Sequence, residues 1–155
     1  MREHTYELSV TWTGNRGEGT HDIRGYDRAH TISADGPPDL LGSADPTFLG
    51  DPQRWNPEQL FVASLAQCHM LWYLGLCARN GVVVSDYVDT AVGTMLTEPD
   101  GSGRFTEIVL HPVVVVESPD QVAKAEALHA DAHRMCFVAQ SVSCAVRHEP
   151  EIVVG

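Results

Sequence analysis

The feature that most constrains this chain is a long apolar segment in its first half, from Trp55 to Gly81. Asn56 is a good N-cap residue, and Pro57 suits the first helical position because its missing N–H would be unpaired there anyway. Gly81 can adopt the left-handed conformation that often ends a helix. The segment therefore predicts one helix from Pro57 to Asn80, about 36 Å long at 1.5 Å per residue.

This predicted helix is apolar on most of its faces. Between Leu60 and Ala78 it contains no Asp, Glu, Lys or Arg, so it belongs either in a protein core or in a bilayer. A membrane span is disfavoured because Gln67 and His69 would lie near the bilayer midplane, where polar groups are costly. Polar, strand-like sequence also lies on both sides of the segment. We therefore expect a buried central helix, covered by sheets or by a second subunit.

Composition bounds the class of protein. The 155 residues, 43% of them hydrophobic and 20% charged, fit a single domain over residues 1–155. A formal net charge of −11 argues against nucleic acid and anionic membranes as partners, since both need a basic face. The first ten residues lack the apolar core of a signal peptide, so we expect a cytoplasmic protein whose four cysteines are not a disulfide framework.

The cysteines differ in what they can do. Cys68 lies near the middle of the predicted helix, and Cys77 lies on the opposite face, about 13 Å further along the axis. A disulfide needs Cα atoms within about 7 Å, so these two cannot pair while the helix is intact. Any partner of Cys68 comes from Cys136, Cys144 or another chain. By itself, Cys68 is either an inert packing residue or the functional centre of the helix.

The rest of the chain alternates strands with one further helix. We predict strands at 6–13, 28–33, 82–97, 104–117, 143–147 and 151–154, a long ordered loop at 34–54, a second helix from Pro119 to about Arg134 with Ser118 as its N-cap, and a short helix at 137–142. The two longest strands should form a hairpin. This order indicates an α+β fold with antiparallel pairing.

With these segments in place, the chain resembles the OsmC/Ohr family of organic hydroperoxide reductases along nearly its whole length. The segments that carry the resemblance are Asn56-Pro57-Glu58-Gln59-Leu60-Phe61, Ala66-Gln67-Cys68 on the same helix, Thr13-Gly14-Asn15-Arg16-Gly17, and Cys136-Phe137-Val138-Ala139-Gln140-Ser141. The resemblance implies an OsmC-like fold: an intertwined homodimer with antiparallel sheets around buried central helices, and active sites at the subunit interface.

The resemblance also implies roles for four residues. Cys68 would be the peroxidatic thiol and Cys136 the resolving thiol, with Arg16 and Glu58 completing the site. Arg24 and Arg28 lie near Arg16 in the sequence and are alternatives for the arginine. Cys77 and Cys144 are interpreted as structural.

The chemistry is consistent with these residue types. A thiolate attacks the O–O bond, and a free thiol titrates near 8.5, so a cation must hold the charge. An arginine is always charged, and its planar fork can also bind peroxide oxygens, while a carboxylate such as Glu58 would fix the fork in place. Cys68 would become a sulfenic acid and condense with Cys136, and an external dithiol, such as a lipoyl-type one, would reduce the disulfide.

This cycle needs no bound cofactor, and it would serve defence against oxidative stress. Apolar surroundings of Cys68 would favour alkyl or lipid hydroperoxides over hydrogen peroxide. Helix geometry adds one constraint: Glu58 and Cys68 are ten residues apart, or about 15 Å along the axis. Both can serve one site only if different chains supply them, or if Arg16 bridges a long gap. We therefore predict an obligate dimer with composite sites.

A metal site is the alternative reading. His129, His133 and Cys136 fall at i, i+4 and i+7, so one helix face could present all three. With Cys68 they would form a Cys₂His₂ set, which zinc accepts. A zinc-binding or non-catalytic ligand-binding protein of the same fold therefore remains open on the sequence alone.

Overall fold

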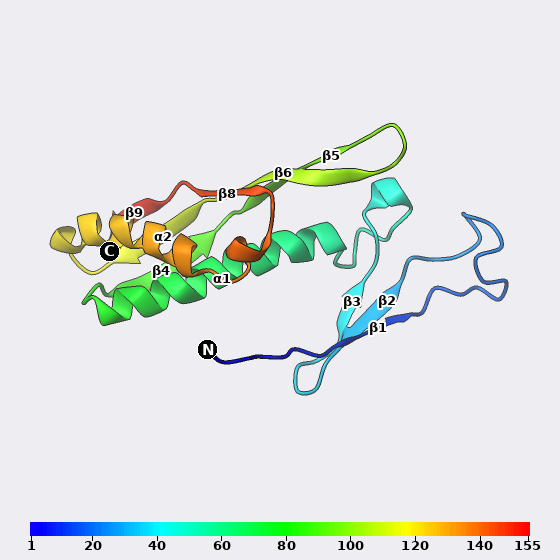
Figure 1. The fold of residues 1–155 in the computed structure, drawn as a ribbon, viewed down its shortest axis with the longest axis horizontal. Coiled ribbons are helices and arrows are strands. Elements are labelled where there is room, and N and C mark those ends of the chain that lie inside the picture. The colour runs from blue at the N-terminus through cyan, green and yellow to red at the C-terminus, as the bar shows by residue number, and fades with distance from the viewer. The chain divides into compact units, whose positions relative to one another are not determined.

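A computed structural model describes all residues of the chain, from Met1 to Gly155. Its internal contacts form two compact units, Met1–Leu60 and Phe61–Gly155. The helix α1 (Pro57–Arg79) begins in the first unit and continues through the second (Figure 1). The single domain expected over residues 1–155 stays a prediction.

The first unit contains a small antiparallel sheet in the order β1-β2-β3. Its strands are β1 (Ser9–Trp12), β2 (His30–Ser33) and β3 (Leu40–Gly42). The strands predicted at 6–13 and 28–33 are present but shorter. The region 34–54, predicted as loop throughout, is more regular than expected. It contains β3 and a 3-10 turn, η1 (Pro46–Phe48), in which the Asp45 side chain accepts a hydrogen bond from the N–H of Thr47.

The ends of α1 follow from the predicted caps. The Asn56 side chain accepts from the N–H of Gln59 at 2.8 Å, and the Gln59 side chain accepts from the N–H of Asn56 at 3.1 Å. This reciprocal pair satisfies two backbone donors that a helix start leaves unpaired. At the other end Gly81 takes φ +72°, and the N–H of Val82 reaches back to the carbonyl of Cys77 at 3.0 Å. The predicted boundaries of the helix are confirmed to within one residue.

Only one stripe of α1 is buried within the single chain. Its buried residues are Leu65, His69, Tyr73 and Cys77, which repeat every four positions. Leu71, on another face, is 64% exposed. By length and composition α1 could cross a membrane, but its buried stripe packs into both apolar clusters of the second unit, as the core helix of a folded domain does. Burial of the remaining faces, expected from the sequence, is not present in one chain.

The long hairpin predicted after α1 is present, but each of its strands is broken in two. The strands are β4 (Val84–Asp89), β5 (Val92–Thr97), β6 (Gly103–Leu110) and β7 (Pro112–Val116). β4 pairs with β7 and β5 with β6, both antiparallel, in two separate sheets. The break lies at His111, whose N–H is accepted by the Asp89 side chain at 2.8 Å instead of by a strand. Pro112, which follows, has no N–H to continue the ladder.

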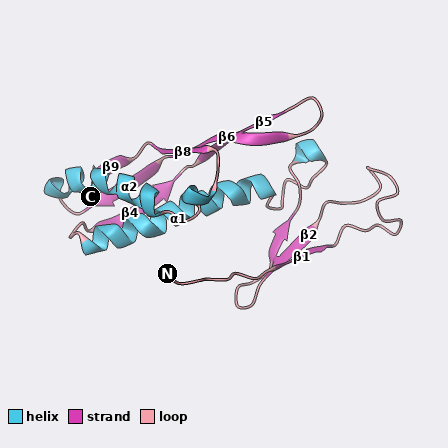
Figure 2. Ribbon diagram, viewed as in Figure 1, coloured by secondary structure: helices cyan, strands magenta, loops and turns pink.

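The last part of the chain corrects the expectation of purely antiparallel pairing. After α2 (Val122–Met135) and the 3-10 turn η3 (Ala139–Ser141), β8 (Ala145–His148) pairs with β6 and β9 (Glu151–Val154) pairs with β7, both parallel. A helical connection returns the chain to the end of the sheet where the earlier strand began, which allows parallel pairing. Figure 2 shows these strands beside the two helices of the unit.

The second helix begins differently from the prediction. A 3-10 turn, η2 (Pro119–Gln121), precedes α2, and the Ser118 hydroxyl donates to Asp120 instead of capping the helix. The short helix predicted at 137–142 is the 3-10 turn η3. One side of α2 is buried at Ala125, Leu128 and Ala132, and His129 is buried among them.

Candidate active site

Cys68 and Cys136 are neighbours in the second unit. Cys68 lies on α1 and is half-buried, whereas Cys136 is the first residue after α2 and is 1% exposed. Both thiols are free, as are those of Cys77 and Cys144. The Cys68 and Cys136 thiols interact with one another, so the structure brings together the two cysteines that the sequence analysis singled out.

The environment of Cys136 keeps its thiol protonated. Burial raises the pKa of Cys136, and interaction with the neighbouring Cys68 thiol raises this pKa further. The backbone N–H of Ala139 donates to the Cys136 sulfur at 3.4 Å and partly offsets the rise. The N–H of Cys136 donates to the carbonyl of His133 at 3.3 Å, which fixes the backbone at the end of α2. A buried, protonated thiol is suited to a second step, after another sulfur has reacted.

An apolar surface lies on the same two segments. Trp72, one helical turn after Cys68, packs edge to face against Phe137, with ring centroids 5.4 Å apart. Phe137 directly follows Cys136 and is 69% exposed. A large exposed aromatic side chain beside Cys136 suits an apolar ligand or a covering protein surface.

Arg16 belongs to the first unit, in the loop between β1 and β2. Its guanidinium donates to the carbonyl of Arg24 at 2.7 Å and lies 3.5 Å from the carboxylate of Asp27. Both side chains of this ion pair are more than half exposed. Exposed pairs of this kind contribute little to stability, about 0–1 kcal/mol, so Arg16 can exchange Asp27 for another anion at low cost.

The two other arginines near Arg16 are placed differently. Arg28 donates to the carbonyls of Tyr26 and Ile23, both at 2.7 Å, and its guanidinium lies 4.1 Å from the centre of the Tyr26 ring. These contacts hold Arg28 within its own loop. Arg24 supports Arg16 through its backbone carbonyl. The side chains of Arg16 and Arg24 are thus freer than that of Arg28 to take another partner.

Glu58 lies in the first turn of α1, as predicted. One of its carboxylate oxygens, Oε2, is buried and has no hydrogen-bond partner in the single chain. An unpaired buried carboxylate oxygen is costly, so this position calls for a donor such as a guanidinium. Arg16 pairs with Asp27 and not with Glu58 within this chain. The joint role predicted for Arg16 and Glu58 stays a prediction.

The structure groups His129 and His133, which the sequence analysis singled out, with His69 and His148, which it missed, in one cluster of four imidazoles. His69 of α1 and His129 of α2 are buried, and their Nε2 and Nδ1 atoms lie 3.0 Å apart. The rings are inclined by only 3° and their centroids are 5.3 Å apart, so they meet edge to edge in a hydrogen bond. The ring of His148, on β8, lies 5.6 Å from His69 and 5.9 Å from both His129 and His133.

Burial governs the titration of this cluster. Desolvation lowers the pKa of His69 to about 4 and that of His129 to about 3, and the neighbouring histidines add to both shifts. The pKa of His148 is also lowered, mainly by burial. The buried imidazoles are therefore neutral at pH 7. For His69, the signal that could have revealed its burial is the four-residue repeat of the α1 stripe, which places it between Leu65 and Tyr73.

The metal alternative finds no support in this geometry. No group of three or more His, Cys, Asp or Glu side chains is arranged to hold a metal ion. In the proposed set of Cys68, His129, His133 and Cys136, His129 uses its Nδ1 in the bond to His69. The Cys136 sulfur accepts from the backbone at Ala139.

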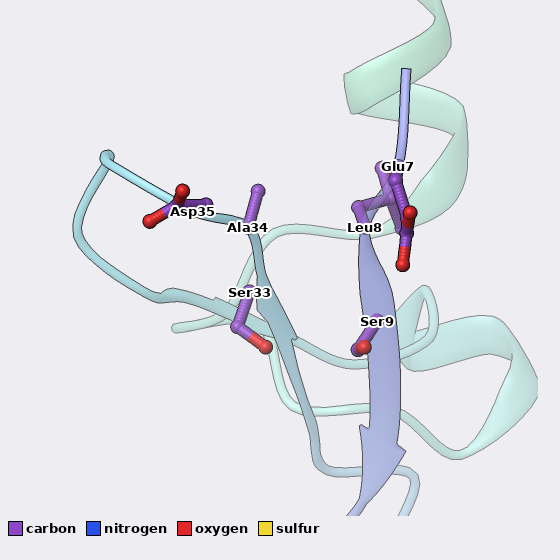
Figure 3. A pocket seen from close by; sticks show the side chains of 6 residues that line it. All are labelled: Glu7, Leu8, Ser9, Ser33, Ala34 and Asp35. Atoms are coloured by element: carbon purple, nitrogen blue, oxygen red, sulfur yellow. The ribbon is translucent and has the colours of Figure 1, made fainter. Parts of the chain in front are cut away.

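A separate hollow in the first unit holds none of the predicted site residues. It has a volume of about 370 Å³ and is lined by Glu7, Leu8, Ser9, Ser33, Ala34 and Asp35, which lie on facing segments at the ends of β1 and β2 (Figure 3). Its only charged groups are two carboxylates, and it contains no nucleophile or base paired for chemistry. We assign no function to it.

Comparison with known proteins places the chain in a family. The profile of the OsmC-like protein family matches residues 50–151. The solved structure of an OsmC-like protein of unknown function from Vibrio cholerae is 36% identical, covers 97% of this chain and 99% of its own, and superposes with a TM-score of 0.83. An uncharacterized protein of Bacillus subtilis, YmaD, is 23% identical and spans 92% of this chain and 89% of its own length.

A more distant structure carries a functional name. The organic hydroperoxide resistance protein of Elizabethkingia anophelis shares 17% identity, covers 99% of this chain and 100% of its own, and superposes with a TM-score of 0.69. At this identity the likeness is one of fold.

The histidine cluster makes stability depend on pH. The ordinary histidine pKa of about 6.5 applies to the unfolded chain, whereas His69 and His129 titrate near 4 and 3 when folded. The unfolded chain therefore binds more protons in this interval, so the free energy of unfolding falls as pH drops from 6.5 toward 4. Urea unfolding from about pH 7.5 to about pH 4.5 measures this decline. The double variant His69→Gln/His129→Asn should decline less steeply, and an equal slope would contradict the assignment.

Proposed function

This chain belongs to the OsmC-like protein family, and from that membership we propose that it is a thiol-dependent peroxidase that reduces organic hydroperoxides to alcohols. The observation that carries the proposal is the pairing of a half-buried thiol, Cys68, with a buried thiol, Cys136, at the end of a neighbouring helix. Family membership alone does not fix the activity, because the relative at 36% identity is described as a protein of unknown function.

The first step is nucleophilic attack by Cys68. Its thiolate attacks one oxygen of the hydroperoxide, an S–O bond forms, and the O–O bond breaks. The departing alkoxide takes up a proton and leaves as the alcohol. Sulfur is oxidised by two electrons to the sulfenic acid and the peroxide is reduced by two.

The second and third steps return the enzyme to its starting state. The Cys136 sulfur attacks the Cys68 sulfenic acid, an S–S bond forms, and the hydroxyl group leaves with the Cys136 proton as water. The high pKa of Cys136 keeps this thiol protonated until then. An external dithiol, such as a lipoyl-type one, then reduces the disulfide by exchange and is itself oxidised to a disulfide.

Arg16 and Glu58 complete the proposed site. The guanidinium of Arg16 would stabilise the Cys68 thiolate and bind the peroxide oxygens, and the unpaired Oε2 of Glu58 would hold that guanidinium. The present partner of Arg16, the carboxylate of Asp27, is exposed and easily exchanged for another anion. In an acidic chain of net charge −11, an anionic sulfur depends on such a local cation.

Organic hydroperoxides suit the surface around the thiols. Trp72 and Phe137 form an apolar edge on the segments that carry Cys68 and Cys136, so alkyl or lipid hydroperoxides are favoured over hydrogen peroxide. This fits the name of the Elizabethkingia neighbour, an organic hydroperoxide resistance protein. We propose a cytoplasmic role in defence against oxidative stress, with no bound cofactor.

We further propose an obligate homodimer with composite sites. α1 is continuous from Pro57 to Arg79, so Glu58 and Cys68 of one chain are held about 15 Å apart along its axis. The apolar faces of α1 that stay exposed in one chain, including Leu71, would be covered by the second copy.

Substitution of each cysteine separates the steps. Cys68→Ser should abolish reduction of cumene hydroperoxide, because no other thiol is placed to attack it. Cys136→Ser should consume about one equivalent of peroxide and then stall as the sulfenic acid or a more oxidised form. Cys144→Ser is the matched control and should keep wild-type turnover. Peroxide consumption measures all three, with excess dithiol for turnover and without it for the single equivalent consumed by Cys136→Ser, and full turnover by Cys68→Ser would refute the mechanism.

Substitution of the arginines tests the cation. Arg16→Met should slow the first step by about 100-fold, because the thiolate and the developing alkoxide both lose their counter-charge. Arg16→Lys should recover only part of the rate, since lysine lacks the planar fork. Arg24→Met, the control, should be near wild type. The single-turnover rate of peroxide consumption is the readout, and a loss with Arg24→Met but not Arg16→Met would reassign the role.

Mixed dimers test the composite site. Cys68→Ser and Glu58→Gln proteins should each be nearly inactive alone. After unfolding and refolding together, about a quarter of all sites would combine an intact Cys68 with an intact Glu58 from the other chain. Activity recovered on mixing supports sites shared between chains. No recovery, with heterodimers shown by mass spectrometry, would contradict it.

A further inference from the structure

Two hydrogen bonds cross the largely apolar contact between α1 and α2. The helices lie side by side (Figure 1), joined by the His69–His129 bond and by the Tyr73 hydroxyl, which donates to the carbonyl of Ala125 at 3.0 Å. From the first contact to the second, the residue number rises by four on α1, from 69 to 73, and falls by four on α2, from 129 to 125, so the helices are antiparallel. His69 is 1% exposed and His129 is 0% exposed.

Burying this imidazole pair has a cost that an apolar pair would not. Each ring loses its hydration, and His129 Nε2 is left buried without any hydrogen-bond partner. The Tyr73 ring stacks on His129, with ring centroids 3.9 Å apart. The centroid of the His148 ring lies 5.9 Å from that of His129. These neighbours fix the orientation of His129. The result is a directional contact, which sets the register of two helices more sharply than apolar packing alone.

Each histidine of the His69–His129 bond is close in sequence to one of the two thiols. His69 directly follows Cys68 on α1. His133, one turn after His129 on α2, accepts the hydrogen bond from the N–H of Cys136 at 3.3 Å. A displacement of α2 along α1 at the histidine pair is therefore passed to the backbone that carries the Cys136 sulfur.

We propose that the His69–His129 hydrogen bond is a positioning contact that holds Cys136 where it can attack the oxidised Cys68. The proposal rests on the proposed peroxidase function, and it assigns both histidines to the second step and not to the first. Neither imidazole touches the peroxide. Their effect is on the approach of the two sulfur atoms, because a disulfide forms only within a narrow range of Cα separation and side-chain direction.

The expected effect follows from that geometry. A misplacement of about 1 Å can slow a reaction between held groups by up to about 100-fold. Loss of the bond should therefore slow disulfide formation by about tenfold or more, while formation of the sulfenic acid keeps its wild-type rate. The slowed sulfenic acid would persist, and dimedone would trap it.

Matched variants separate positioning from general loosening. His69→Leu and His129→Leu remove the bond. His69→Gln and His129→Asn place an amide near the bonded ring nitrogen and should restore it. Tyr73→Phe removes the other hydrogen bond between the same two helices, further from the thiols, and is the control for lost stability. If a leucine variant does not fold, His69→Asn replaces it, because its shorter amide does not reach His129.

The experiment follows one turnover of the full-length protein with one equivalent of cumene hydroperoxide. Dimedone labelling measures the sulfenic acid and peptide mapping measures the Cys68–Cys136 disulfide over time. Support requires a slow second step in the variants that lack the bond, rescue by the amide variants, and a wild-type second step in Tyr73→Phe. The proposal is overturned if those variants form the disulfide at the wild-type rate, or if Tyr73→Phe slows it equally. A wild type that forms neither the sulfenic acid nor the Cys68–Cys136 disulfide would instead refute the peroxidase function.

Discussion

The packing of α1 against α2 is the interaction on which the rest of this structure depends. α1 is too apolar to stand alone, and its buried stripe of Leu65, His69, Tyr73 and Cys77 needs a partner. α2 supplies part of that partner, and Cys136, the first residue after α2, lies next to the sulfur of Cys68. The strands complete the cover, with β8 returning parallel to β6 and bringing His148 to the same place. The arrangement that buries the helix is thus also the one that pairs the thiols.

The two thiols of the proposed cycle occupy unlike environments. Cys136 is buried and its pKa is raised, so at neutral pH it carries a proton that the condensation step releases. Cys68 is more accessible and lies beside the apolar edge formed by Trp72 and Phe137. This division matches an order of events in which Cys68 reacts with peroxide first. In the proposed mechanism Arg16 supplies the cation that such a thiolate needs, and its partner in this chain, Asp27, is an exposed carboxylate.

Local sequence signals predicted the helices and strands well, whereas contacts between residues distant in the sequence were harder to predict. The caps at Asn56 and Gly81 are local, so the ends of α1 could be read directly. The break at His111 depends on Asp89, a residue on another strand, and the parallel pairing of β8 and β9 depends on where α2 returns the chain. The adjacency of Cys68 and Cys136 followed from family resemblance. The sequence analysis singled out His129 and His133 on one helix, but it missed His69 and His148, because these lie on two other elements and meet the first pair only in the folded chain.

The measurement that tests the central claim most directly is peptide mapping by mass spectrometry after one equivalent of an organic hydroperoxide, without added reductant. A peptide that joins Cys68 to Cys136 should appear, with Cys77 and Cys144 still free, and a dithiol should reverse it. Protein that stays fully reduced while the hydroperoxide persists would contradict the claim that these two thiols form a redox pair. A disulfide that excludes Cys136 would contradict it equally.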